Sequence, residues 1–124
     1  MILLLGGTGE ARALAARLVD AGAPVVSSLA GRVSRPRLPA GEVRIGGFGG
    51  IEGLAAWVID HRVDRVVDAT HPFAATISAH AVDACARTGT PLRPDFAKVM
   101  QASASMRQPG ARDVVPAGEG IGVV

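Results

Sequence analysis

A glycine-rich turn near the start of the chain has the residue types and spacing of a phosphate-binding site. The segment Gly6-Gly7-Thr8-Gly9 follows a run of aliphatic residues, Ile2 to Leu5, typical of a strand buried on both faces of a parallel sheet. After Gly9, apolar residues recur at helical spacing. A helix N-terminus behind such a turn presents free N–H groups and the positive end of its dipole to an anion. Because Gly-Gly-x-Gly is shorter than the full G-x-G-x-x-G fingerprint, a tight turn without a ligand is the alternative.

Three arginines follow the second predicted strand, Pro24–Leu29. The stretch from Ser27 to Leu38 contains Arg32, Arg35 and Arg37 but no acid. In a doubly wound sheet this stretch faces the same crevice as the first glycine turn. An acid there binds the ribose 2′-hydroxyl of NAD(H), whereas an arginine suits the 2′-phosphate of NADP(H). The pattern favours NADP(H), with a solvated basic loop as the alternative.

A second glycine-rich turn, Gly46–Gly50, follows a short third strand, Val43–Ile45. Its glycines permit close approach of the backbone to a ligand, and Phe48 offers a ring to lie against another planar group. The alternative is a flexible loop whose phenylalanine covers the edge of the core. A second helix is predicted from about Ile51 to Asp60.

The most distinctive heptapeptide is Asp68–Ala74, at the end of a fourth predicted strand, Val63–Val67. Thr70 suits the N-cap of the following helix, which is predicted to run to about Thr88-Gly89. His71 should face the crevice, as a hydrogen-bond donor to substrate carboxylates or as a capping group. Asp68 is expected to stabilise the turn.

Composition indicates one small domain. The chain has 124 residues, of which 48% are hydrophobic, and a net charge of +2. It has no basic run to bind nucleic acid or a membrane surface. No apolar run approaches the roughly 20 residues that span a bilayer, and the apolar start lacks the basic flank of a signal peptide. We therefore expect a cytoplasmic protein.

The cysteine and the histidines are not spaced as metal ligands. The single cysteine, Cys85, cannot form an internal disulfide and lies on the apolar stripe of a predicted helix, which indicates a core residue. His61 and His80 have no partners at ligand spacing. No metal site is expected.

The predicted architecture is an α/β, Rossmann-like parallel sheet with flanking helices over residues 1–92. A fifth strand is expected to begin at Gly89–Leu92, as the next βα repeat requires. From residue 93 to residue 124, Gly, Pro, Ser, Ala and charged residues dominate without a clear period. This part is interpreted as a divergent irregular tail, in which only Phe96–Met106 suggests a short helix.

Four segments together resemble precorrin-6A reductase and its counterpart, cobalt-precorrin-6A reductase. They are Leu5–Arg12, Ser28–Arg32, Arg44–Gly50 and Asp68–Ala74. The resemblance covers about residues 1–92, the N-terminal part of a longer family with two Rossmann-like lobes around cofactor and tetrapyrrole. It implies an NADPH-dependent reduction of one macrocycle double bond on the route to cobalamin, with a metal-free or a cobalt-containing substrate.

The resemblance also implies which residues bind. His71 is the candidate for substrate, and no residue is identified as the proton donor. The implied cofactor-binding residues are Gly6, Gly7, Thr8, Glu10, Ser28, Ala30, Gly31, Arg32, Gly46, Phe48, Gly49 and Thr70.

The family pattern stops after Leu92, as it would in a truncated or frame-shifted reading frame. The second lobe is absent from the pattern, so a non-catalytic dinucleotide-binding lobe or an inactive fragment is the alternative function. A short-chain dehydrogenase usually needs a catalytic tyrosine and a nearby lysine. This chain has no tyrosine, and its lysine, Lys98, lies in the tail, so that class of enzyme is excluded. A fifth strand that stops at Leu92 would leave one edge of the sheet uncovered, and an exposed strand edge favours self-association.

Overall fold

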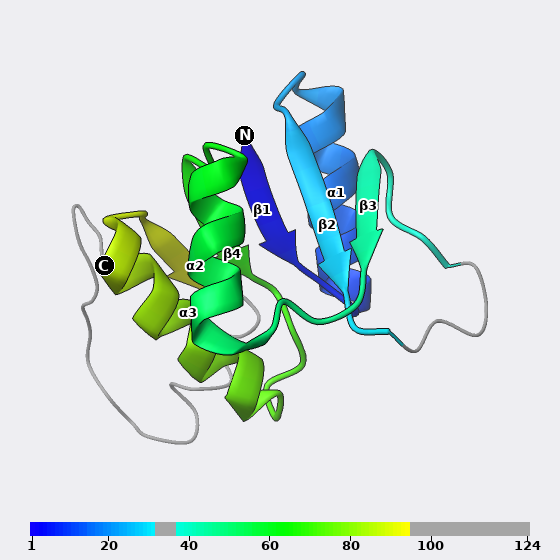
Figure 1. The fold of residues 1–124 in the computed structure, drawn as a ribbon. Coiled ribbons are helices and arrows are strands. Elements are labelled where there is room, and N and C mark those ends of the chain that lie inside the picture. Colours follow the sequence, from blue (N-terminus) through cyan, green and yellow to red (C-terminus); the bar gives the residue numbers. More distant parts are fainter. Residues whose placement is uncertain (32–36, 95–124) are drawn as a thin grey trace, which may run out of the picture.

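The computed structural model describes residues 1–31 and 37–94. Its five strands form one parallel sheet in the order β3-β2-β1-β4-β5 (Figure 1). This arrangement confirms the predicted α/β, Rossmann-like class. The elements are β1 (Ile2–Leu5), α1 (Gly9–Asp20), β2 (Val25–Leu29), β3 (Glu42–Ile45), α2 (Gly50–Asp60), β4 (Arg65–Asp68), α3 (Ala75–Thr88) and β5 (Leu92–Pro94).

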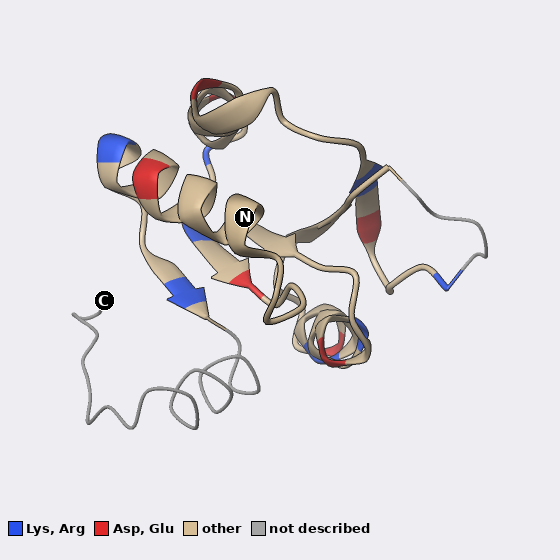
Figure 2. Cartoon of the chain, turned by 90° about the horizontal axis from the view of Figure 1, so that it is seen from below, with Lys and Arg blue, Asp and Glu red and all other residues tan. Residues whose placement is uncertain are grey.

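Helices cover both faces of the sheet. Seen from below, the sheet lies between α1 on one side and α2 and α3 on the other (Figure 2). The central strand β1 is buried on both faces, as predicted: Leu3 and Leu5 belong to the core under α2 and α3, and Leu4 to the core under α1. Its apolar run has no polar alternation because neither face meets water.

The apolar stripes of the first two helices pack as their periodicity predicts. In α1, Ala11 and Ala15 are buried. In α2, Leu54 and Val58 are buried against the same core as Leu3. The first helix ends at Asp20 with Ala21 as its C-cap, and Gly22 follows with φ +79°, a conformation that suits glycine.

The prediction that Thr70 caps the third helix is wrong. The N-cap of α3 is Ala74, and no side chain caps the helix. The Thr70 hydroxyl instead donates to Asp68 Oδ1 at 2.6 Å. The backbone then makes a turn, in which the Ala74 N–H donates to the His71 carbonyl at 2.9 Å, before the helix begins.

The fifth strand confirms the expected βα repeat. It begins at Leu92, the last residue of the predicted start, and continues to Pro94. It pairs with β4 through Pro94, which lies opposite Asp68. The irregular tail from residue 95, with the helix suggested at Phe96–Met106, lies outside the described residues. In the described part of the chain, no helix has the length and apolar character needed to cross a membrane.

Cys85 is a core residue, as predicted. Its side chain is buried in α3 against the core that contains Leu3, and this desolvation raises the pKa of its thiol to about 12. The cysteine therefore acts as a small apolar residue and not as a thiolate nucleophile.

Helix α2 approaches the second glycine turn so closely that one of its positions requires glycine. A Cβ added to Gly53 would lie 1.7 Å from the Phe48 carbonyl oxygen and 2.7 Å from its carbonyl carbon. Because both are backbone atoms, the loop or the helix would have to move. Gly53 thus holds the loop against the first turns of α2.

We expect Gly53→Ala to lower the free energy of unfolding by about 1–3 kcal/mol, the usual cost of overpacking, although alanine favours a helix. Gly9→Ala is the matched control. Gly9 is also helical, but its Cβ would meet only the flexible end of Arg12, at 3.7 Å. Urea unfolding of both variants measures the difference. An unchanged midpoint for Gly53→Ala would show that the loop does not need this close approach.

Candidate functional site

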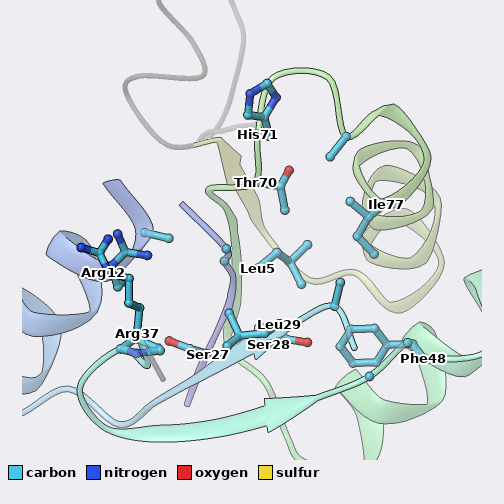
Figure 3. A pocket seen from close by; sticks show the side chains of 18 residues that line it. Leu5, Arg12, Ser27, Ser28, Leu29, Arg37, Phe48, Thr70, His71 and Ile77 are labelled. Atoms are coloured by element: carbon cyan, nitrogen blue, oxygen red, sulfur yellow. The ribbon is translucent and has the colours of Figure 1, made fainter. Parts of the chain in front are cut away.

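A cleft with a volume of about 620 Å³ opens at the carboxyl ends of β1, β2 and β4 (Figure 3). Parallel strands end at the same edge of a sheet, so the turns that follow them meet there. Its lining residues are Leu5, Gly6, Gly7, Ala11, Arg12, Ser27, Ser28, Leu29, Ala30, Arg37, Pro39, Gly46, Gly47, Phe48, Thr70, His71, Ala74 and Ile77.

The first glycine turn is held by a threonine hydroxyl. Thr8 is the N-cap of α1, and its Oγ1 accepts from the Ala11 N–H at 3.0 Å. The same hydroxyl donates to the Ala69 carbonyl at 2.8 Å, which ties the turn to the end of β4. Gly7 has φ +107°, a conformation that disfavours any side chain. The backbone between β1 and α1 is therefore preorganised, and Thr8 serves the turn and does not line the cleft.

Arg44, which lies outside the predicted set, anchors the second glycine turn. Its Nη1 donates to the Ser28 hydroxyl and to the Gly46 carbonyl, both at 3.0 Å, and its Nη2 donates to the Gly47 carbonyl at 3.1 Å. Its guanidinium carbon lies 3.8 Å from the centroid of the Phe48 ring. Partial burial lowers the pKa of Arg44, but the four contacts compensate for the lost hydration. An arginine in a strand just before a glycine turn is the sequence signal for this role.

The sequence predicts that Phe48 either offers its ring to a ligand or covers the edge of the core, and its position has features of both. The ring packs against the core under α2 and α3 and makes an edge contact with Trp57, with 5.8 Å between centroids. This is the core-covering role. Phe48 also lines the cleft, although Arg44 lies over its ring.

Asp68 organises the third turn of the cleft. Its carboxylate is buried and accepts from the Thr70 N–H at 3.1 Å, the Thr70 hydroxyl at 2.6 Å and the Ser78 hydroxyl at 2.5 Å. These charge-assisted bonds join the end of β4 to the first turn of α3. The expectation that Asp68 stabilises the turn is confirmed.

His71 lies at the mouth of the cleft and is exposed. Its Nδ1 accepts from the Phe73 N–H at 3.1 Å, so the neutral ring carries its proton on Nε2. His71 therefore lines the cleft and holds the turn before α3, but it does not cap that helix, whose N-cap is Ala74.

The structure brings most of the predicted binding residues to one cleft. Glu10 lines a different depression, together with Arg17 and Arg65, and Arg32 lies outside the described residues. Gly6, Gly7, Ser28, Ala30, Gly46, Phe48, Thr70 and His71 line the cleft, whereas Thr8, Gly31 and Gly49 do not. Arg12, Ser27 and Arg37 line it without belonging to the predicted set. Within residues 1–31 and 37–94, no group of three or more His, Cys, Asp or Glu side chains could hold a metal.

Comparisons with known proteins identify the family that this chain resembles. The model of the family "Precorrin-6x reductase CbiJ/CobK" matches residues 1–103. Precorrin-6A reductase of Rhodococcus erythropolis is 64% identical over 100 residues, and that of Mycobacterium tuberculosis is 61% identical over 90 residues. A solved structure of CobK precorrin-6A reductase superposes with a TM-score of 0.73 at 50% identity and covers 75% of this chain.

The matches cover only part of each relative. The chain spans 40% of the Rhodococcus protein, 36% of the Mycobacterium protein and 37% of the solved CobK chain. The family match also extends to residue 103, whereas the motifs alone placed the end of the resemblance at Leu92. The motifs ended early because the residues after Leu92 contain no glycine turn or strand pattern that can be identified without a relative.

We expect Asp68→Asn to lower the free energy of unfolding by about 1.5–3 kcal/mol, because the amide lacks the charge and directs N–H groups at hydroxyl donors. Asp83→Asn on the exposed side of α3 is the control for the loss of one negative charge. Urea unfolding of both variants is the measurement. Equal stability of the two would contradict the role of Asp68 in the turn.

Proposed function

Because the chain belongs to the precorrin-6x reductase CbiJ/CobK family, we propose that it forms the cofactor-binding lobe of an NADPH-dependent precorrin-6A reductase. The reaction proposed is the reduction of one ring double bond of a tetrapyrrole in cobalamin biosynthesis. The cleft formed by the glycine turns is the observation that carries this proposal, because a dinucleotide binds at this edge of an open α/β sheet.

The nicotinamide would supply the hydride when it is bound. The part of the protein in the reaction would be to bind the cofactor and the tetrapyrrole and to orient them toward each other. The Gly6–Gly7 backbone and the N-terminus of α1 would hold the pyrophosphate. Phe48 and Ile77 give the cleft an apolar wall, and His71 at its mouth offers an N–H to the carboxylates of a tetrapyrrole.

NADPH is proposed in preference to NADH on the ground of charge. The described residues that line the cleft include two arginines and one histidine but no Asp or Glu. A carboxylate that would bind a ribose 2′-hydroxyl is therefore missing from this wall, and a 2′-phosphate meets no repulsion there. Arg32 stays a predicted ligand of the 2′-phosphate.

A dinucleotide-binding lobe without catalytic activity is the second candidate. It is favoured by the lining of the cleft, in which the described residues suit a dinucleotide and none is identified as a proton donor. In a two-lobed family, the other lobe would contribute the opposite wall of the tetrapyrrole site. NADPH oxidation with precorrin-6A under single-turnover conditions separates the two candidates. Binding of NADPH without any substrate-dependent oxidation would favour the non-catalytic lobe.

Gly7→Val should abolish NADPH binding in a calorimetric titration while the chain stays folded. A Cβ at Gly7 meets no protein atom within 4 Å, so the effect comes from its φ of +107° and from the space that the pyrophosphate would take.

Gly22→Val is the matched control. It imposes a similar backbone strain, with φ +79° and open space around the Cβ, at the far end of α1. Circular dichroism of both variants monitors folding. Full NADPH affinity in Gly7→Val would move the pyrophosphate site away from this turn and remove the main support for the proposal.

A further inference from the structure

One side of the cleft is basic and is built from residues distant in sequence. Arg12 comes from α1, Ser27 from the middle of β2, and Arg37 from the segment that leads toward β3. Figure 3 shows the two arginines on the same side of the cleft, with the Ser27 hydroxyl directed toward Arg37. His71 and Thr70 lie on the other side.

Ser27 has an unusual environment for a hydroxyl. Its side chain is 2% exposed, and its Oγ has no hydrogen-bond partner within the described residues. A buried hydroxyl without a partner costs free energy, and such groups are rare unless a ligand or water completes them. Its neighbour Ser28, by contrast, accepts a hydrogen bond from Arg44. The floor of the cleft therefore offers a polar group that a ligand can satisfy.

Arg12 and Arg37 have no acidic partner among the described residues. In the described part of the chain, neither the Arg12 nor the Arg37 side chain makes an ion pair or a hydrogen bond. Arg12 lies in the first turn of α1, where the positive end of the helix dipole disfavours a cation. Its Nη2 lies only 3.7 Å from the position that a Cβ on Gly9 would take. The acid of that turn, Glu10, lines a different depression.

We propose that Arg12, Arg37 and Ser27 form a phosphate subsite for the 2′-phosphate of the cofactor. Two guanidinium groups match the charge of a phosphate monoester, and the Ser27 hydroxyl adds a donor from the floor. Ser27 and Arg37 place the subsite beside β2, where the adenosine ribose lies in doubly wound folds, rather than at the Gly6–Gly7 turn. The inference rests on the proposed function, because it identifies the residues that would select NADPH over NADH.

Calorimetric titration of the full chain with adenosine 2′-monophosphate and adenosine 5′-monophosphate tests the subsite without requiring catalysis. Arg12→Ala and Arg37→Ala should each weaken the binding of the 2′-isomer by roughly 10- to 100-fold and change that of the 5′-isomer little. Arg17→Ala, which removes an exposed arginine of the same helix, is the control for net charge. Equal losses for both nucleotides would place the arginines at the pyrophosphate and overturn the assignment.

Ser27→Ala gives a second, independent readout. The substitution removes an unpartnered polar atom, so the melting temperature of the ligand-free chain should stay unchanged or rise. Affinity for the 2′-isomer should nevertheless fall by about 2- to 10-fold. A neutral effect on affinity would show that the hydroxyl is merely buried, and the proposed subsite would be wrong.

Parallel titrations with NADPH and NADH separate this inference from the proposed function. If the wild-type chain binds NADPH but the three variants keep its preference over NADH, the subsite is refuted and the proposed function stands. The subsite is likewise refuted, and the proposed function stands, if Arg32→Ala is the one variant that removes the preference for NADPH over NADH. If the chain binds neither dinucleotide, the proposed function fails, whereas selective loss of 2′-isomer binding in the variants still supports a phosphate monoester subsite.

Discussion

The parallel pairing of β1 with β2 and β4 is the constraint on which the rest of the structure depends. Leu5 lies opposite both Ser28 and Asp68, so three strands end at the same level. The backbone bonds continue past the strands, because the Gly6 N–H donates to the Ser28 carbonyl and the Ala69 N–H to the Leu5 carbonyl, both at 2.9 Å. The segments that follow β1, β2 and β4 consequently begin side by side. The second glycine turn, which follows β3, joins them because the Gly46 N–H donates to the Leu29 carbonyl at 2.8 Å.

Beyond that edge, the sheet no longer supplies hydrogen bonds, and polar side chains position the turns instead. Thr8 joins the first turn to β4, Arg44 binds two carbonyls of the second, and Asp68 joins the third to α3. Each anchor has backbone groups among its partners, so each fixes the course of the main chain rather than only a side chain. A cleft built in this way can present its glycine backbone to a ligand in a defined shape before the ligand arrives.

The elements could be predicted from the sequence because the burial of each depends on its own apolar pattern. The run Ile2–Leu5 and the helical stripe through Ala11 and Ala15 are examples. The site was predictable where residue type implies backbone geometry, as at Gly7, and where a residue follows the carboxyl end of a predicted strand, as at Ala30 and His71. The role of Arg44 depends on the register that places Ser28 beside it, and the proximity of Arg12, Ser27 and Arg37 depends on how α1 lies on the sheet. Thr70 fits the capping rule by residue type, but α3 begins only at Ala75 with Ala74 as its N-cap, so Thr70 lies too far before the helix to cap it.

The anchors also bear on how this lobe relates to its longer relatives. All the partners of Thr8, Arg44 and Asp68 described above lie within residues 8–78, inside the region that the family model matches. These three anchors of the turns therefore belong to the part of the chain that resembles the family. Under the proposed function, binding of the cofactor and completion of a tetrapyrrole site would be separable in physical terms, because only the second would need a facing wall.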